Sequence, residues 1–294
     1  MEMLIELYCS VDDFWKDFSK QWEQYLIAKG KLPRGPKTEM SIPEMMTISI
    51  LFHQSNYRNF KHFYCNHVMI YLRKEFPTLI SYSRFVYLLK TLFIPLFAYL
   101  LHNRGTVTGV SFIDSTKIQV CHNKRMKRNK VFARFAKMGK TGAGWFFGVK
   151  LHLIINEVGE ILAFQLTPGN TSDVSVADIL SKRITGNLYG DKGYISGKLG
   201  KKLMDRGLQL FTNLRSKMKN KFMKLRDKVL LRKRAIIETV NDQLKNISQI
   251  EHTRHRSISN FLVNTLCAIA AYMRQPKKPR IKMSDKESLE LVVC

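Results

Sequence analysis

The chain has 294 residues, 45% hydrophobic and 24% charged, which is enough apolar material for one large or two ordinary soluble domains with real cores. Lys and Arg number 49 and Asp and Glu only 23, so the formal net charge is +26. This excess predicts a polyanionic partner. Nucleic acid is favoured over an anionic membrane surface, because the sequence shows no long amphipathic helix whose only polar face is rich in lysine.

The cysteines exclude two further classes of protein. They lie far apart and form no CxxC pair, which argues against a zinc finger and against a disulfide scaffold: Cys9, Cys65, Cys121, Cys267 and Cys294. We therefore expect a reducing cytoplasm. No secretory signal is expected, since acids stand in the first residues, and the apolar stretch 88–101 contains Lys90 and Pro95 and is too short to span a membrane.

The first hundred residues predict an all-α N-terminal domain. A helix is expected over 10–26, with Ser10 and Asp13 as a capping-box-like start, and another over 41–54, with Ser41 and Glu44 in the same roles. A loop at 30–40 separates them. The helix 41–54, a tight joint at 54–56 and a helix at 57–74 fit either a helix-turn-helix DNA reader or an ordinary four-helix packing unit.

From Gly109 onward the pattern changes to strands. We predict a strand at 109–120, a hairpin over 144–170 that turns at 157–160, and short strands at 187–190 and 208–215. Helices are expected at 173–184, 197–207 and 232–247. This order predicts an α/β fold with a mixed sheet covered by helices.

Three acids stand at informative places in these elements. Asp114 ends the apolar run VSFI, Asp191 follows the strand NLYG, and Glu238 lies inside the last helix. Each has an ordinary explanation when taken alone, as a cap, a turn residue or a member of a solvated helix face. At about 100° per residue, Arg234 and Lys245 share one helix stripe with Glu238.

Taken together, the three acids suggest a metal site. Converging carboxylates repel one another and must bind protons or cations, and hard oxygen ligands suit Mg²⁺ or Mn²⁺. Two such ions about 3.5–4 Å apart hold the attacking and leaving oxygens of a phosphodiester. In a chain of charge +26, an acid cluster with a basic surface predicts an enzyme that cuts or joins nucleic acid.

These residues also resemble a known family. Asp114 in FIDST, Asp191 in GDKGY and Glu238 in RKRAIIETVNDQLK are similar to the DDE transposases of bacterial insertion sequences, which have an RNase H-like fold. The similarity is greatest to the insertion sequence 982 group. It includes FHQSNYRNFKHFY, EFPTLISYSRFV, GVKLHLIIN and LTPGNTSDV, and it covers about residues 5–275.

The resemblance implies roles for individual residues. Asp114, Asp191 and Glu238 would be catalytic and hold two Mg²⁺ or Mn²⁺ ions, and Arg234 and Lys245 would grip phosphates near the scissile bond. Related transposases carry a tyrosine where this chain has Leu231, so the contact of that tyrosine with DNA has no counterpart here. Lys150, His152 and Lys192 are further candidates for DNA binding, with ordinary surface positions as the alternative.

Two basic stretches fit a DNA partner. Residues 124–140 hold eight Lys or Arg, and residues 215–234 hold ten. In the first we expect DNA contacts from Lys124, Arg125, Lys127 and Arg128 and disorder without DNA, the alternative being solvated loops.

We expect three parts: a helical DNA-binding domain at 1–104, an RNase H-like catalytic domain at 105–275, and a basic, disordered tail at 276–294. The partners would be double-stranded DNA, as terminal inverted repeats and target, and a second copy in a homodimer. The alternatives are a metal-dependent nuclease of the same fold, an inactive DNA-binding relative and an RNA-associated structural protein. The last would explain the charge but not the acids.

Overall fold

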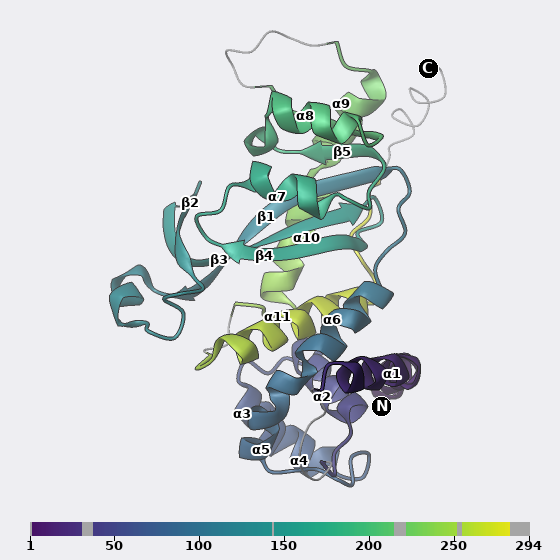
Figure 1. Cartoon of the computed structure of the whole chain (residues 1–294), viewed down its shortest axis with the longest axis vertical. Coiled ribbons are helices and arrows are strands. Elements are labelled where there is room, and N and C mark those ends of the chain that lie inside the picture. The colour runs from purple at the N-terminus through teal and green to yellow at the C-terminus, as the bar shows by residue number, and fades with distance from the viewer. Residues whose placement is uncertain (1, 31–37, 143, 215–221, 252–254, 283–294) are drawn as a thin grey trace. The chain divides into compact units, whose positions relative to one another are not determined.

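The computed structural model describes the chain except for residues 1, 31–37, 143, 215–221, 252–254 and 283–294 (Figure 1). The predicted loop 30–40, the basic stretch 215–234 and the predicted tail therefore lie partly outside the described residues. The chain divides into two compact units: residues 1–103 with 244–275, and residues 104–243 with 276–294. The first boundary between the units, between residues 103 and 104, lies one residue before the boundary predicted between 104 and 105. Residues 244–275, however, belong to the helical unit and not to the predicted catalytic domain.

The helical unit is built from amphipathic and fully apolar helices. They are α1 (Glu2–Ala28), α2 (Ile42–Gln54), α3 (Phe60–Phe63), the π-helix η1 (Tyr64–Val68), α4 (Met69–Tyr71), α5 (Tyr82–Leu88), the 3₁₀ helix η2 (Leu89–Leu92), α6 (Phe93–His102) and α11 (Ile258–Met273). Helix α11 packs on α2 and α6, and α1 packs on both as well. An all-α N-terminal region is thus confirmed, with α11 as a late addition from the far end of the sequence.

The predicted helix starts have different outcomes. The capping box at Ser41 is confirmed, since its side chain accepts from the Glu44 amide and the Glu44 carboxylate accepts from the Ser41 amide at 2.7 Å. The predicted start at Ser10 is wrong, because α1 already begins at Glu2. Ser10 is instead within the helix, 3.0 Å from the hydroxyl of Tyr99. The helix predicted over 57–74 is broken by a π-helical turn, as η1 separates α3 from α4.

Residues Tyr82–His102 form 21 residues of helix that are long and apolar enough to cross a membrane by length and composition alone. This differs from the prediction that the apolar stretch is too short. Leu92, Leu96 and Leu100 are fully buried in the helical unit, where α6 contacts α11. The core helix of a soluble protein passes the same test, so this one helix is weak support for a membrane span.

The second unit is a mixed sheet flanked by helices, which confirms the predicted RNase H-like α/β fold. Its strands are β1 (Val110–Cys121), β2 (Lys137–Thr141), β3 (Gly144–Asn156), β4 (Ile161–Pro168), β5 (Gly186–Gly190) and β6 (Leu208–Thr212), in the order β2-β3-β1-β5-β6 with β4 also on β3. The helices are the 3₁₀ helices η3 (Asn123–Arg128) and η4 (Lys192–Tyr194), with α7 (Asp173–Leu180), α8 (Gly197–Met204), α9 (Leu225–Lys233) and α10 (Ala235–Asn246).

The direction of pairing changes in the middle of the sheet. Strands β1 to β4 pair antiparallel, whereas β1 pairs with β5, and β5 with β6, in parallel. The predicted hairpin over 144–170 is confirmed, because β3 and β4 are joined at residues 157–160. Strand β2 and η3 occupy the stretch 124–140 that was expected to be disordered, so that expectation is wrong: β2 pairs with the first half of β3.

Two glycines fix the register of the parallel pair β1 and β5. Gly109 and Gly186 both adopt φ of +90°, which side chains other than glycine rarely adopt. A Cβ on Gly186 would lie 2.5 Å from the carbonyl oxygen of Gly109, while the Asn187 amide donates to that same oxygen at 2.8 Å. This close approach starts the pairing, and Phe112 then stands opposite Tyr189.

Candidate functional site

The register of β1 and β5 brings two of the predicted acids together. Phe112 pairs with Tyr189, and each acid stands two residues further along its strand direction, Asp114 on β1 and Asp191 just after β5. Parallel strands end at the same edge of a sheet, so these carboxyl groups leave neighbouring strands at the same level. Charge interactions from Asp191 and Glu238 both act on Asp114, which places all three acids in one electrostatic neighbourhood.

Asp114 is the buried member of this cluster. Burial, with the negative charges of Asp191 and Glu238, raises the pKa of its carboxyl group to about 6, against the lowering effects of the Ser115 amide and of Arg234. The side-chain amide of Asn241 on α10 donates to Asp114 Oδ2 at 3.1 Å. A carboxylate whose pKa is raised in this way is stabilised in its charged form by any cation that comes close to it.

Asp191 is held by the turn that follows β5. Its Oδ1 accepts from the amide of Gly193 at 2.8 Å and caps η4. A Cβ on Gly193 would lie 2.9 Å from that same oxygen, so a side chain at this position would displace the Asp191 carboxylate. The position of Asp191 is therefore compatible both with a role in the turn and with a role in the candidate site.

Glu238 comes from the first turn of α10. Its carboxylate accepts from the Arg234 guanidinium at 2.8 Å, and its side chain is 58% exposed. The helix predicted over 232–247 is in fact two, because α9 ends at Lys233 and α10 begins at Ala235. Arg234 stands at this junction, four residues before Glu238, as the predicted stripe requires. Lys245 lies in the helical unit, where its ammonium is 3.6 Å from Glu251.

The acids of this cluster have the donor chemistry of a divalent-cation site. The three carboxylates are hard oxygen donors, the pKa of Asp114 is raised for want of a close cation, and Asn241 Oδ1 is a buried oxygen with no hydrogen-bond partner among the described residues. Within the described part of the chain, no group of three or more His, Cys, Asp or Glu side chains is arranged to hold a metal ion. The donor set fits such an ion, although Glu238 is turned to Arg234 in this structure.

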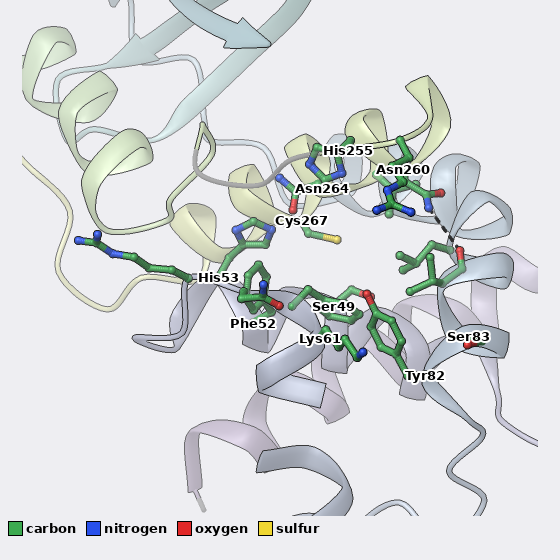
Figure 2. A pocket seen from close by; sticks show the side chains of 17 residues that line it. Ser49, Phe52, His53, Lys61, Tyr82, Ser83, His255, Asn260, Asn264 and Cys267 are labelled. Carbon is green, nitrogen blue, oxygen red and sulfur yellow. Dashed lines mark hydrogen bonds between the residues drawn. The ribbon is translucent and has the colours of Figure 1, made fainter. Parts of the chain in front are cut away.

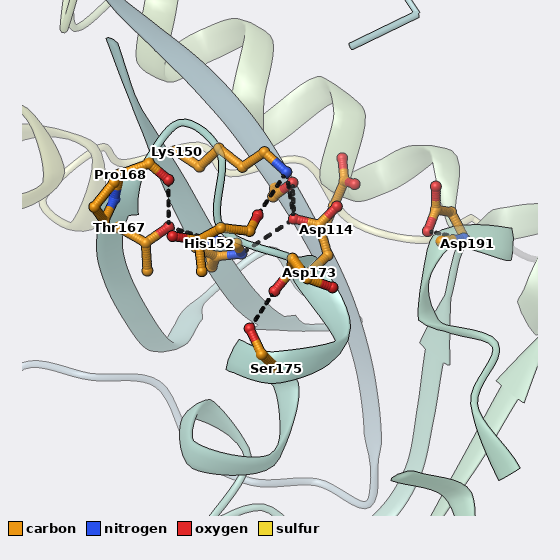
Figure 3. A network of polar contacts seen from close by, with 12 residues as sticks. Asp114, Lys150, His152, Thr167, Pro168, Asp173, Ser175 and Asp191 are labelled. Carbon is orange, nitrogen blue, oxygen red and sulfur yellow. Dashed lines mark hydrogen bonds and ion pairs between the residues drawn. The ribbon is translucent and has the colours of Figure 1, made fainter. Parts of the chain in front are cut away.

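A second polar network lies beside the first strand and was not predicted. Asp173, the first residue of α7, accepts from the Lys150 ammonium at 3.0 Å and from the Ser115 hydroxyl at 2.9 Å (Figure 3). Lys150 also donates to the carbonyl of Thr171 at 3.1 Å, and its side chain is only 11% exposed. Ser115 directly follows Asp114 in β1, so its hydrogen bond to Asp173 holds β1 in place next to Asp114.

His152 belongs to this network and not to the surface. It is 1% exposed, and its Nε2 lies 2.8 Å from the Thr167 hydroxyl. Burial lowers its pKa to about 4, so the imidazole is neutral at physiological pH. The prediction that His152 contacts DNA does not agree with this position, because a buried neutral ring cannot reach a phosphate.

Tyr194 of η4 is another residue near the acids that the sequence did not predict. It is fully buried, and its hydroxyl has no hydrogen-bond partner among the described residues. Burial raises the pKa of the phenol, and the charges of Asp114, Asp173 and Asp191 raise it further. The phenol therefore stays protonated beside both aspartates of the cluster.

The remaining predicted DNA contacts lie at the surface. Lys192 is exposed and directly follows Asp191. The exposed side chains on η3 are Lys124, Arg125, Lys127 and Arg128. A positively charged surface thus exists in this unit, while contact with DNA remains a prediction for each of these residues.

The helical unit contains a cavity of about 900 Å³ that includes none of the predicted site residues. Figure 2 shows His53, His255, Asn264 and Cys267 gathered on one side of it. The Nδ1 of His53 lies 2.6 Å from the carbonyl of Ser248, and burial lowers the pKa of His53 to about 4. This contact joins α2 to the segment that precedes α11.

Comparison with known proteins agrees with the sheet unit. Residues 104–258 match the family described as "Transposase DDE domain". No curated protein matches the chain. Among solved structures, the chain is similar to "piggyBac transposase synaptic complex with hairpin DNA", determined by cryo-EM, at 10% identity and a TM-score of 0.47, covering 100% of this chain and 77% of that one.

Proposed function

This chain belongs to the transposase DDE-domain family, and from that premise we propose that it is an insertion-sequence transposase of the 982 group. It would bind the ends of its element and catalyse cleavage and transfer of DNA strands. The observation that supports this proposal is the register of β1 and β5, which sets Asp114 beside Asp191 and lets both share a charge neighbourhood with Glu238. Enzymes of this family are nucleotidyl-transfer enzymes that generally use divalent metal ions.

Asp114, Asp191 and Glu238 would hold two Mg²⁺ or Mn²⁺ ions. Such ions, when bound, stabilise the charge that develops on the attacking and leaving oxygens of a phosphodiester. For Glu238 to contribute, its ion pair with Arg234 must open. That pair is exposed on the glutamate side, and pairs of this kind contribute roughly 0–1 kcal/mol.

Neighbouring side chains would set up these carboxylates and the DNA. Asn241 holds Asp114 Oδ2 through its amide, and the turn at Gly193 holds Asp191. Once Glu238 is released, the guanidinium of Arg234 is free to bind a phosphate oxygen next to the scissile bond. Lys192 would add a second positive charge beside Asp191, and Tyr194 would supply a protonated hydroxyl.

The proposed reaction has two in-line displacements at phosphorus. In the first, a water oxygen attacks the phosphorus and the bond to the 3′-oxygen breaks. A proton given up by the water is returned, through solvent, to the departing 3′-oxygen, so the products are a 3′-hydroxyl and a 5′-phosphate. In the second, the freed 3′-hydroxyl attacks a phosphodiester of target DNA, and one 3′-oxygen replaces the other. Because two element ends must be joined to one target, we also propose that a homodimer is the active form.

The test is a single-turnover reaction on a labelled duplex that carries the element's ends, with Mg²⁺ and a target duplex. Wild type is expected to give both the cleaved and the joined product. Hydrolysis without joining would identify the nuclease alternative. A protein that binds the duplex and gives neither product would be an inactive DNA-binding relative, and the proposal would then be wrong for this chain.

A further inference from the structure

Residues 276–282 (PKKPRIK) were predicted to be a disordered tail, but the structure places them against the sheet unit. The amide of Ile281 donates to the carbonyl of Glu157, in the turn between β3 and β4, at 2.9 Å. Pro276 and Pro279 restrict the backbone and favour an extended course. This segment, here called the basic strap, is therefore a folded part of the sheet unit and is tied down near its end.

The basic strap forms one wall of a groove of about 1050 Å³. The opposite wall comes from the end of α9 and the start of α10. Six cationic residues line the groove: Arg232, Lys233, Lys277, Lys278, Arg280 and Lys282. Such a concentration of positive charge in a concave site raises the local concentration of anions.

The acidic residues of this groove are already engaged. Glu160 is the acid that lines it, and its carboxylate accepts from the side-chain amide of Asn156 at 2.8 Å and from the Thr106 amide at 3.3 Å. Glu157, in the same turn, accepts from the Thr108 hydroxyl at 2.6 Å. The six cationic residues of the lining outnumber its one carboxylate, so the groove keeps a net positive charge that attracts an external anion.

The groove begins on the helix that carries the catalytic glutamate. Ala235 and Thr239 line it, and each directly follows a residue of the candidate site, Arg234 and Glu238. Successive residues on a helix are about 100° apart, so the groove face and the site face of α10 are adjacent. A polyanion bound at Arg234 would thus continue into the groove.

From these observations we infer that the groove between the basic strap and the α9–α10 junction binds the sugar–phosphate backbone of duplex DNA next to the cleavage site. The inference rests on the proposed function and adds a specific binding surface to it. Seven residues of extended chain span about 19 Å. One DNA strand presents a phosphate about every 3.4 Å along the helix axis, so a strap of this length can face several successive phosphates.

The first test measures how DNA binding depends on salt. A strap variant replaces Lys277, Lys278, Arg280 and Lys282 by Gln. The matched control replaces four exposed cations of the α7–α8 region, Lys182, Arg183, Lys198 and Lys201, by Gln. Both variants lose four positive charges from a net charge of +26, so only the position of the loss differs.

Binding of a 30-base-pair duplex of arbitrary sequence is measured across a salt series, with thermal melting of each variant as a check of folding. Each phosphate contact contributes about 0.9 to the slope of log K against log salt. The slope is expected to fall in magnitude by about 2–4 for the strap variant, which should also bind the duplex at least about tenfold more weakly at 100 mM salt. For the control variant the slope should fall by less than about 1. Equal losses in the two variants would overturn the inference.

A second measurement uses the wild-type protein and so does not depend on the folding of a variant. Lysines are acetylated with acetic anhydride with and without the duplex, and modified sites are quantified by mass spectrometry. Lys277 and Lys282 are expected to be protected several-fold by DNA, and Lys198 and Lys201 not. Binding without protection of the strap would overturn the inference and leave the proposed function intact. A wild type that bound no duplex at any salt would refute the proposed function itself.

Discussion

The side-chain amide of Asn241 donates to Asp114 Oδ2 at 3.1 Å, and this contact ties helix α10 to the first strand of the sheet. The two residues are 127 positions apart in the sequence. Asn241 is 7% exposed and stands three residues after Glu238, so the same helix both supplies one acid and orients another. The position of the carboxyl group of Asp114 thus depends on how α10 packs.

Asn241→Ala should therefore weaken the site without removing an acid. Loss of a partner that orients a metal-binding carboxylate typically reduces metal affinity or activity about 10–100-fold, and we expect this range for Mn²⁺ affinity and single-turnover cleavage. Calorimetric titration of Mn²⁺ measures the first of these quantities. Asn246→Ala, at an exposed amide on the same helix, is the control. Unchanged Mn²⁺ affinity in Asn241→Ala would show that the contact does not orient Asp114.

The raised pKa of Asp114 predicts how stability depends on pH in metal-free protein. The folded state holds the proton up to about pH 6, whereas the unfolded carboxyl group loses it near 3.8. The free energy of unfolding should therefore fall as pH rises from about 4 to 6. Asp114→Asn removes this penalty and should stabilise the protein by about 1–3 kcal/mol at pH 7.5 and hardly at all at pH 4.

Urea denaturation in the presence of a chelator, at pH 4, 6 and 7.5, measures this effect. Asp178→Asn provides a control of opposite sign, because the hydrogen bond from Lys202 lowers the pKa of Asp178. Asp178→Asn should therefore lower the free energy of unfolding above about pH 4, and this loss should disappear at lower pH. If Asp114→Asn were less stable than wild type at pH 7.5, the carboxylate would be favourably solvated or paired, against the present description.

The ion pair of Lys150 and Asp173 is largely shielded from solvent, with side chains 11% and 27% exposed. Removing one partner leaves the other charge without compensation, so Lys150→Met or Asp173→Asn should each cost about 1–3 kcal/mol of unfolding free energy. The double variant Lys150→Met/Asp173→Asn should recover part of this loss. Lys16→Met, at the exposed pair with Asp12, should have no measurable effect. Additive losses in the double variant would exclude a coupling between the two residues.

His152→Gln separates a structural from a DNA-binding role. Gln can keep the hydrogen bond to Thr167, and the buried ring does not reach DNA, so duplex affinity should stay within about twofold of wild type while stability falls by about 1 kcal/mol. The pKa of about 4 means that wild-type stability from this residue is complete above pH 6.5 and is lost as pH falls toward 4. A tenfold loss of duplex affinity in a folded variant would restore the role predicted from the sequence.

Local patterns in the sequence predicted much of the fold. The capping box at Ser41, the β3–β4 hairpin and the strand that ends at Asp191 all follow from signals within a few residues. The start of α1 at Glu2 was missed because Ser10 also fits a cap, and the position of α11 was missed because only tertiary packing assigns it to the helical unit. The strand β2 was hidden inside a segment whose charge suggested disorder.

The candidate site could be predicted only in part for a similar reason. Asp114 was visible because it ends the apolar run VSFI and Asp191 because it follows the strand NLYG, and their register follows from the glycines at 109 and 186. Asn241 and Asp173 carry no such signal, since an amide in a helix and an acid at a helix start are common. Their importance comes from contacts with residues that are distant in the sequence, Asp114 and Lys150.

The most direct test of the central claim compares three conservative variants, Asp114→Asn, Asp191→Asn and Glu238→Gln, with Asp205→Asn as an exposed acid of the same unit. Single-turnover cleavage of the labelled end duplex is measured at saturating Mg²⁺, after thermal melting confirms that each variant folds. We predict that each of the three loses at least about 10³-fold in rate, because each removes a carboxylate that would hold the metal ions whose positive charge stabilises the transition state, and that Asp205→Asn cleaves like wild type. Wild-type cleavage by any one of the three variants would show that these acids do not form one catalytic site.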